Sequence, residues 1–203
     1  MSASPVLLAL REATAAAHDK LEIEARIEAR LADVRTRPAT VAAFYRFHAG
    51  LEPVSHIQVA RLNAAVGGDF GPRSRADGIV RDLAALGLTP PPAASAEGPG
   101  TAGQALGWVY VAEGSMLGGR IIRRRLAADG RGLEGLGFLD PYGEETGARW
   151  RAFMTLMDAA CAAGCADIDQ IVKGGVDGFA FARHTLRVST CLLYTSDAAA
   201  EGL

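Results

Sequence analysis

The sequence contains no long apolar run and only three cysteines. The apolar run Val6–Leu10 ends at Arg11, so it is too short for the core of a signal peptide. No stretch approaches the roughly 18 apolar residues that a membrane span requires. Cys161, Cys165 and Cys191 form no CxxC pair, and their odd number favours a reducing compartment. We therefore expect a cytoplasmic protein that does not enter a membrane.

An excess of positive charge and phosphate-binding loops are also lacking. The chain has 21 basic and 23 acidic residues, a formal net charge of −2, which argues against nucleic acid as a partner. No GxGxxG motif follows a strand and no P-loop is present, so no nucleotide cofactor is indicated. One local basic cluster is compatible with a docking surface or with an ordinary solvated helix face. It comprises Arg120, Arg123, Arg124 and Arg125.

Sustained alternation of apolar and polar residues is absent as well, whereas helical spacing recurs along most of the chain. Ser4 and Pro5 form a helix-start signal, and Gly67 ends a later helix that Pro53 should kink. The expected helices cover residues 5–31, 40–66, 74–86, 101–129, 144–163 and 167–188.

These segments predict an all-α fold of about seven or eight helices. Residues 23–31 either continue the first helix or form a short second one. The loop over residues 89–100 is rich in proline and glycine, but the segments on either side are too small to stand alone. We therefore expect one domain over residues 1–191, followed by an unstructured tail over residues 192–203.

The most unusual helix is the one that carries several interior glycines, each of which costs about 1 kcal/mol relative to alanine. At about 100° per residue, one face of it collects Gly107, Tyr110, Gly114, Gly118 and Ile121. The middle of that face has almost no side chains. Either a second helix or a planar ligand is expected to lie against it.

His18 is the most informative polar residue. Arg11, Thr14 and Glu22 lie on nearly the same helix face. A metal-ligating imidazole usually gives its other nitrogen to an acceptor, which a carboxylate four residues later can supply. A single histidine on a helix is more often packed or exposed without a ligand, and this interpretation applies to His48, His56 and His184.

Together the two helices describe a slot for a planar, iron-bearing ligand with a carboxylate edge, and haem fits that description. The segment Leu10–Glu22, with its Leu-Arg-Glu-Ala-Thr run and His18, and the segment Gly107–Gly119 resemble the bacterial haem oxygenase family. The likeness is greatest to the biliverdin-producing enzymes associated with bacteriophytochromes, and it covers roughly residues 5–190.

The resemblance implies an all-α fold with haem between a proximal and a kinked distal helix. His18 matches the iron ligand of the proximal helix, and Glu22 the residue that supports it. Arg11 and Tyr110 match positions that contact the haem propionates, and Thr14 is grouped with these haem-binding residues.

On the distal side, Gly114 and Gly118 match the glycines whose backbone lies over the haem face. Ser115 stands where animal-type enzymes carry an aspartate that orders water, and we group it with the two glycines as a catalytic residue. Phe181 is a candidate residue at the haem edge. Met116 departs from the more usual small or polar residue.

The implied activity is cleavage of haem to biliverdin, CO and ferrous iron, with O₂ and electrons from a ferredoxin or a flavoprotein reductase. A bacteriophytochrome is a candidate acceptor of the biliverdin. The alternatives are a haem carrier or sensor with the same fold, and a thiaminase-like helical enzyme. The last of these would need Cys161 or Cys165 to converge with acidic residues on a small pocket.

Overall fold

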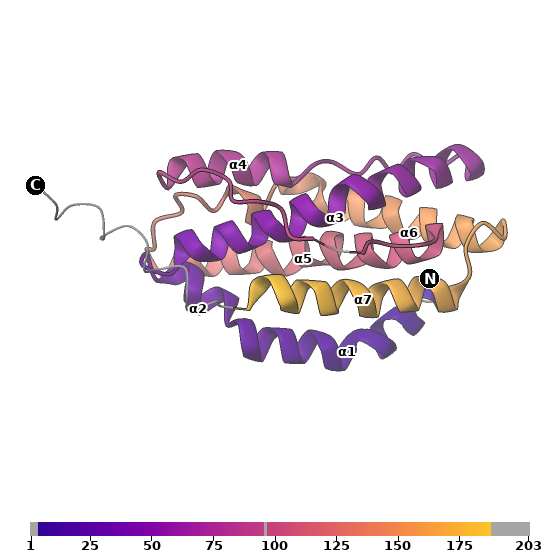
Figure 1. Ribbon diagram of the computed structural model, residues 1–203, viewed down its shortest axis with the longest axis horizontal. Coiled ribbons are helices and arrows are strands. Elements are labelled where there is room, and N and C mark those ends of the chain that lie inside the picture. The colour runs from indigo at the N-terminus through magenta and orange to yellow at the C-terminus, as the bar shows by residue number, and fades with distance from the viewer. Residues whose placement is uncertain (1–3, 96, 188–203) are drawn as a thin grey trace, which may run out of the picture.

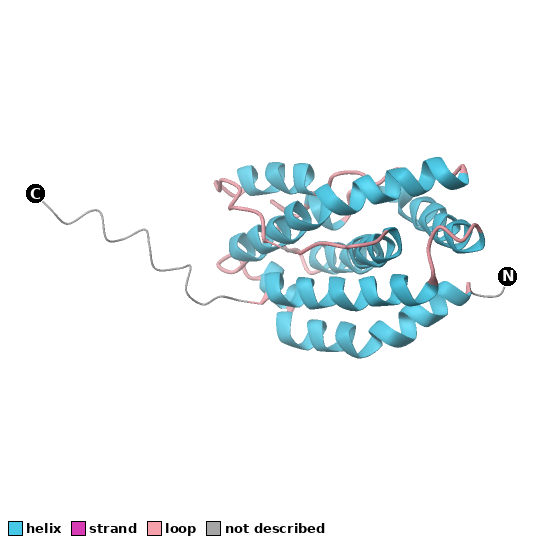
Figure 2. Cartoon of the chain, turned by 45° about the vertical axis from the view of Figure 1, so that its right-hand side comes forward, coloured by secondary structure: helices cyan, strands magenta, loops and turns pink. Residues whose placement is uncertain are grey.

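The computed structural model describes residues 4–95 and 97–187, so the tail predicted over residues 192–203 lies outside the described residues. Within them the protein is helical and contains no strand (Figure 2). Its seven α-helices are α1 (Pro5–Ala25), α2 (Ile27–Ala32), α3 (Arg37–Val66), α4 (Ala76–Ala85), α5 (Ala102–Ala128), α6 (Thr146–Ala162) and α7 (Ile168–Leu186). Two short 3-10 turns, η1 (Gly137–Leu139) and η2 (Gly143–Glu145), lie between α5 and α6. The all-α prediction is confirmed.

Helix α5 occupies the centre of the bundle. It packs most extensively against α7, and it also contacts α3, α6 and η1. Helix α7 in turn packs against α1, so that α7 lies between α1 and α5 in Figure 1. Helix α4 covers the outer side of α3. This arrangement places α1 and α5 on either side of α7.

Local capping chemistry explains where several helices begin. The side chains of Ser4, Thr101 and Asp167 accept hydrogen bonds from backbone N–H groups in the first turns of α1, α5 and α7. The helix expected from residue 74 begins at Ala76 with Arg75 as its N-cap, and the Ser74 hydroxyl accepts from the Asp77 N–H at 3.2 Å. These helix starts follow from short-range signals alone.

The division between α1 and α2 has a different cause. Arg26 adopts a left-handed conformation, with φ 44° and ψ 45°, and ends α1 through a hydrogen bond from its N–H to the Glu22 carbonyl. It is the one non-glycine residue with a positive φ in the described part of the chain. The break therefore falls three residues later than Ile23.

Neither of the two positions where a kink was expected ends its helix. Helix α3 continues through Pro53, and α5 continues through Gly118 and Gly119. Near Pro53, the Ser55 hydroxyl donates to the Leu51 carbonyl at 2.6 Å. Among the described residues, none of these helices combines the length and apolar character that crossing a bilayer requires.

Glycines allow α5 and α7 to approach closely. A Cβ on Gly107 would collide with the backbone of α7 at Ile171 and Gly175. One turn further along α7, a Cβ on Gly178 would lie 3.0 Å from the Val111 side chain. The two helices therefore run in the same direction with their backbones in contact. At this level of α5 the bare face meets another helix.

Candidate functional site

A cavity of about 790 Å³ opens between α1 and α5. Residues of α2, α3, α6, α7 and η1 also line it, and its inner side is apolar and aromatic, including Phe44, Phe47, Phe138 and Phe179. Volumes of roughly 300–1,000 Å³ are typical of small-molecule and cofactor sites. The cavity is therefore large enough for a flat organic ligand.

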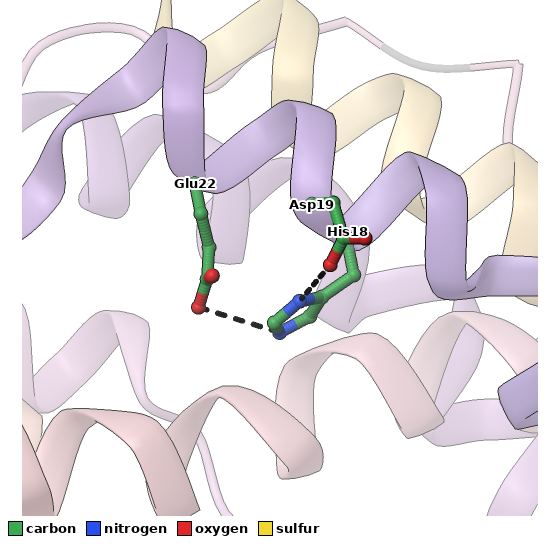
Figure 3. A group of neighbouring side chains, drawn as sticks. All are labelled: His18, Asp19 and Glu22. Atoms are coloured by element: carbon green, nitrogen blue, oxygen red, sulfur yellow. Dashed lines mark ion pairs between the residues drawn. The ribbon is translucent and has the colours of Figure 1, made fainter.

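His18 lies on the α1 side of this cavity, with its side chain 54% exposed. Its Nε2 is 3.9 Å from Glu22 Oε1, and its Nδ1 is 3.9 Å from Asp19 Oδ1 (Figure 3). The edge of the Phe179 ring packs against the imidazole at a centroid distance of 5.8 Å. The two 3.9 Å separations between the imidazole and the carboxylates exceed hydrogen-bond length, so the carboxylates hold the imidazole only loosely. The sequence predicted Glu22 as its neighbour but missed Asp19.

Gly114 and Gly118 lie on the α5 side of the same cavity. A Cβ on Gly118 would meet no atom within 4 Å, and one on Gly114 would meet only the Trp150 ring, at 3.9 Å. Neither glycine is therefore required by protein packing. Their bare backbone borders open space, which fits a flat ligand such as haem.

Arg11 and Tyr110 also line the cavity. Arg11 is seven residues from His18, about 10 Å along the helix, and the Tyr110 ring lies 5.9 Å from that of Trp150. The cavity lining thus brings together the candidate iron ligand His18, its neighbour Glu22, and the glycines Gly114 and Gly118. Arg11 and Tyr110 are the candidates for binding the carboxylate edge of the ligand. The donors present suit haem: one imidazole for iron, apolar walls for the ring and arginine for the acidic edge.

Two predicted haem-binding residues lie elsewhere. Thr14 is 2% exposed, does not line the cavity, and donates its hydroxyl proton to the Leu10 carbonyl at 2.6 Å. Phe181 stacks on Trp108 at 5.2 Å and contacts Phe47 at 5.6 Å, also outside the lining. Phe179, two residues earlier on α7, takes the position expected for Phe181. Successive helix positions face different directions, so the cavity lining gives no support to these two predicted haem contacts.

Ser115 lines the cavity, but its hydroxyl already makes two hydrogen bonds within the protein. It donates to the Ala112 carbonyl at 2.7 Å and accepts from Arg75 Nη1 at 3.1 Å. Arg75 is 5% exposed, lines the same cavity, and also donates to the carbonyls of Ala112 and Phe138, at 2.9 Å each. Sequence reasoning missed Arg75, because its partners lie 37 to 63 residues away.

Glu113, in the middle of α5, is buried. It is 4% exposed, and its Oε2 has no hydrogen-bond partner within the described residues. Burial raises the pKa of Glu113 to about 7, against the opposing charges of Arg75 and Arg149. The apolar stretch around it, Val109–Ala112, was the available signal for burial.

His48 and Glu52 form a buried polar pair next to Arg75. His48 Nδ1 is 3.2 Å from Glu52 Oε1, and Glu52 accepts from the Ser74 hydroxyl and the Arg75 N–H, each at 2.9 Å. Burial, aided by the charge of Arg75, lowers the pKa of His48 to about 4. Burial alone would raise the pKa of Glu52, but the hydrogen bonds outweigh it and lower the pKa. Glu52 thereby holds the start of α4.

Cys161 and Cys165, the cysteines of the described residues, do not contribute to the cavity. Cys161 is half-buried, Cys165 is exposed beyond the end of α6, and neither lines the cavity. Their positions give no support to the thiaminase-like alternative.

Comparison with known proteins agrees with this geometry. The model of the family described as heme oxygenase matches residues 4–187. The structure is similar to a crystal structure of NO- and CO-bound heme oxygenase from Neisseria meningitidis, with a TM-score of 0.67 and 27% identity over 91% of this chain and 92% of that chain. A search of curated protein sequences found no match. The chain belongs to the haem oxygenase family, whose members bind haem as substrate and prosthetic group.

Proposed function

We propose that this enzyme cleaves haem to biliverdin, CO and ferrous iron, using O₂ and an external reductant. The observation that carries the proposal is the pairing of a half-exposed His18 on α1 with two glycines, Gly114 and Gly118, whose Cβ positions are open on α5. The family assignment supports haem as the ligand between them.

In this proposal bound haem supplies the iron that binds O₂ and the ring that is opened. His18 holds the iron through one ring nitrogen, with Glu22 beside the imidazole. Arg11 and Tyr110 bind the propionate edge and thereby fix how the ring is turned in its plane. Because the reacting carbon is chosen by position, these two residues control which biliverdin isomer forms.

On the opposite side, Gly114 and Gly118 keep side chains out of the space above the ring. The apolar inner wall excludes water from that space, which strengthens the remaining polar interactions. Ser115, fixed by Arg75, places a hydroxyl at the same wall. These groups are our candidates for positioning the distal side, since no aspartate is present at position 115.

The test is addition of hemin to the purified protein, followed by ascorbate and O₂. A Soret band that decays while a biliverdin absorbance grows supports the oxygenase. A Soret band that persists favours the carrier or sensor, and absence of any band contradicts both. His18→Ala should greatly weaken the Soret spectrum, whereas His184→Ala, on α7 outside the cavity lining, is the matched control. An unchanged spectrum in His18→Ala contradicts the ligand assignment.

Electrons are proposed to come from a ferredoxin or a flavoprotein reductase, because the sequence has no nucleotide-binding motif. The basic cluster near the end of α5 is the candidate docking surface. Arg120 lies 3.7 Å from Asp140 and Arg125 lies 3.1 Å from Glu28, whereas exposed Arg124 has no ion pair in the described residues. Arg124→Glu should change the salt dependence of reductase-supported turnover and leave ascorbate-supported turnover unchanged. Equal salt dependence contradicts this surface.

The product is proposed to serve a bacteriophytochrome. The likeness of Gly107–Gly119 to the enzymes associated with those photoreceptors supports this assignment. An apo-bacteriophytochrome mixed with the enzyme, hemin and reductant should acquire its red-absorbing band. Failure to do so with this enzyme's product, when authentic biliverdin succeeds, contradicts the proposal.

A further inference from the structure

Three potential metal ligands meet on the exposed middle of α1. His18, Asp19 and Glu22 each offer one ligand atom, and these atoms lie within 4.8 Å of one another (Figure 3). Ligands bound at 2.0–2.2 Å to one cation are separated by at most about 4.4 Å. Each carboxylate lies 3.9 Å from an imidazole nitrogen, Asp19 from Nδ1 and Glu22 from Nε2, so the ring must turn for one nitrogen to share a cation with both. Because all three side chains are exposed, a small rotation closes the remaining gap.

The two carboxylates have no other cation to neutralise them. Within the described residues, Asp19 and Glu22 approach no lysine or arginine to ion-pair distance, and their side chains are 77% and 71% exposed. Glu24, on the same helix, is by contrast surrounded by Lys20, Arg183 and Arg187. The imidazole of His18 is therefore flanked by two free negative charges, an arrangement that attracts a cation.

The donor set indicates which cation. One imidazole nitrogen with two carboxylate oxygens suits a divalent ion such as Fe²⁺ or Mn²⁺, and it lacks the thiolates that select softer metals. The spacing of His18 and Glu22, four residues, places both on one helix face, as in helical metal sites of the HExxH kind. Asp19 completes a three-ligand face with the remaining positions open to water.

We propose that His18, Asp19 and Glu22 form a binding site for a free divalent cation, and that it receives the ferrous iron released from haem. The second part rests on the proposed function, because it requires iron to be set free beside His18. The transfer is a ligand exchange: Fe²⁺ leaves the ring nitrogens and binds the imidazole and the carboxylates, and no electron moves.

The site excludes haem when it is occupied. In this proposal the cation takes the same imidazole nitrogen that would hold the haem iron, so hemin and the cation compete for His18. Asp19 does not line the cavity, in contrast to His18 and Glu22. Asp19 is therefore the residue that separates cation binding from haem binding.

The experiment measures Mn²⁺ binding to the hemin-free full chain by the electron paramagnetic resonance signal of the free ion. Mn²⁺ is chosen because it resists oxidation and thiols compete poorly for it. We expect one site, about tenfold weaker in Asp19→Asn and unchanged in Glu12→Gln, which removes the same charge from an exposed position of α1. Added hemin should release the bound Mn²⁺, and anaerobic Fe²⁺ should compete with it.

Equal Mn²⁺ affinity in Asp19→Asn and Glu12→Gln overturns the proposal, and so does Mn²⁺ retained by the hemin complex. A hemin titration of Asp19→Asn separates this failure from that of the proposed function. A normal Soret band with unaltered Mn²⁺ binding removes only the cation site. Absence of the Soret band in the unmodified protein removes the haem assignment and the iron source with it.

Discussion

The two halves of α5 use glycine for opposite purposes. In the first half, a Cβ on Gly107 would collide with the backbone of α7, so the glycine allows two helices to touch. In the second half, a Cβ on Gly118 would meet nothing within 4 Å, and the helix borders the cavity instead. The first half is closely packed against α7, whereas in the second half Gly114 and Gly118 leave a bare surface toward the cavity, although Gly119 there packs against the Leu139 carbonyl.

This difference teaches that a glycine is explained by what its absent side chain would have met. A glycine against backbone is a packing requirement, and its replacement is resisted by the folded protein. A glycine against open space costs helix stability without improving packing. The presence of Gly114 and Gly118 in spite of this loss of helix stability indicates that a ligand occupies the space beside them. Substitutions in the two halves should therefore have opposite effects on the unliganded protein.

The largest effect is expected from Gly107→Ala. Its methyl group has no room because the neighbours are backbone atoms of α7, so the two central helices must separate. We expect the free energy of unfolding to fall by about 3 kcal/mol, the upper range for overpacked cores. Urea unfolding of the hemin-free protein measures this. A loss below about 1 kcal/mol would show that the two halves do not differ in packing.

Glu113, between the two halves, should make stability depend on pH. Its folded pKa of about 7 lies above the ordinary 4.5, so the folded state binds more protons between these values. Stability from this group is complete below pH 4.5 and falls as pH rises toward 7 and above. The 2.5-unit difference amounts to about 3 kcal/mol. Glu113→Gln should remove this pH-dependent loss of stability. The variant should therefore be more stable than the unmodified protein at pH 8 but not at pH 4.5.

His48 acts in the opposite direction. Its folded pKa of about 4 lies below the ordinary 6.5, so its contribution is complete above pH 6.5 and is lost as pH falls through 4. The two groups nearly cancel between pH 4.5 and 6.5. Urea unfolding of Glu113→Gln should therefore show stability rising with pH in that window. Parallel curves for the two proteins would contradict the burial of Glu113.

Gly118→Ala should have a smaller effect, of opposite sign to that of Gly107→Ala. Alanine improves helix propensity by up to about 1 kcal/mol, and its methyl group meets no protein atom. The same methyl group occupies the space assigned to haem, so we expect about tenfold weaker hemin binding. Thermal unfolding and a Soret titration measure the two effects. Gly78→Ala on α4, outside the cavity, is the control, and equal hemin affinity in both variants would contradict the assignment.

The parts of the fold that the sequence predicted are those set by short-range chemistry. Ser4 caps α1 through the Leu7 N–H, three residues away, so its role follows from the local sequence. The alignment of His18 with Glu22 follows from helix geometry in the same way. The break at Arg26 was misplaced because a left-handed arginine carries no local signal.

The parts that the sequence missed depend on contacts between distant segments. Arg75 gains its partners on α5 and η1, and its local sequence shows only the start of a helix. Glu113 is buried by elements that the chain reaches much earlier and later. Thr14 and Phe181 lie outside the cavity lining, because the exact rotation of a helix is fixed by its packing partners.

The smallest expected effects distinguish Phe181 from Phe179 on α7. The Phe181 side chain contacts the first half of α5, whereas the Phe179 side chain lines the cavity. Phe181 stacks on Trp108 in the first half, so Phe181→Leu should cost about 1 kcal/mol of stability and leave hemin affinity unchanged. Phe179 lines the cavity and packs on His18, so Phe179→Leu should shift the Soret maximum and weaken hemin binding a few-fold. Urea unfolding and a hemin titration of both variants provide the measurement. If Phe181→Leu perturbed the Soret band more than Phe179→Leu, the sequence expectation for Phe181 would be restored, because the haem would then have to reach the packed half of α5.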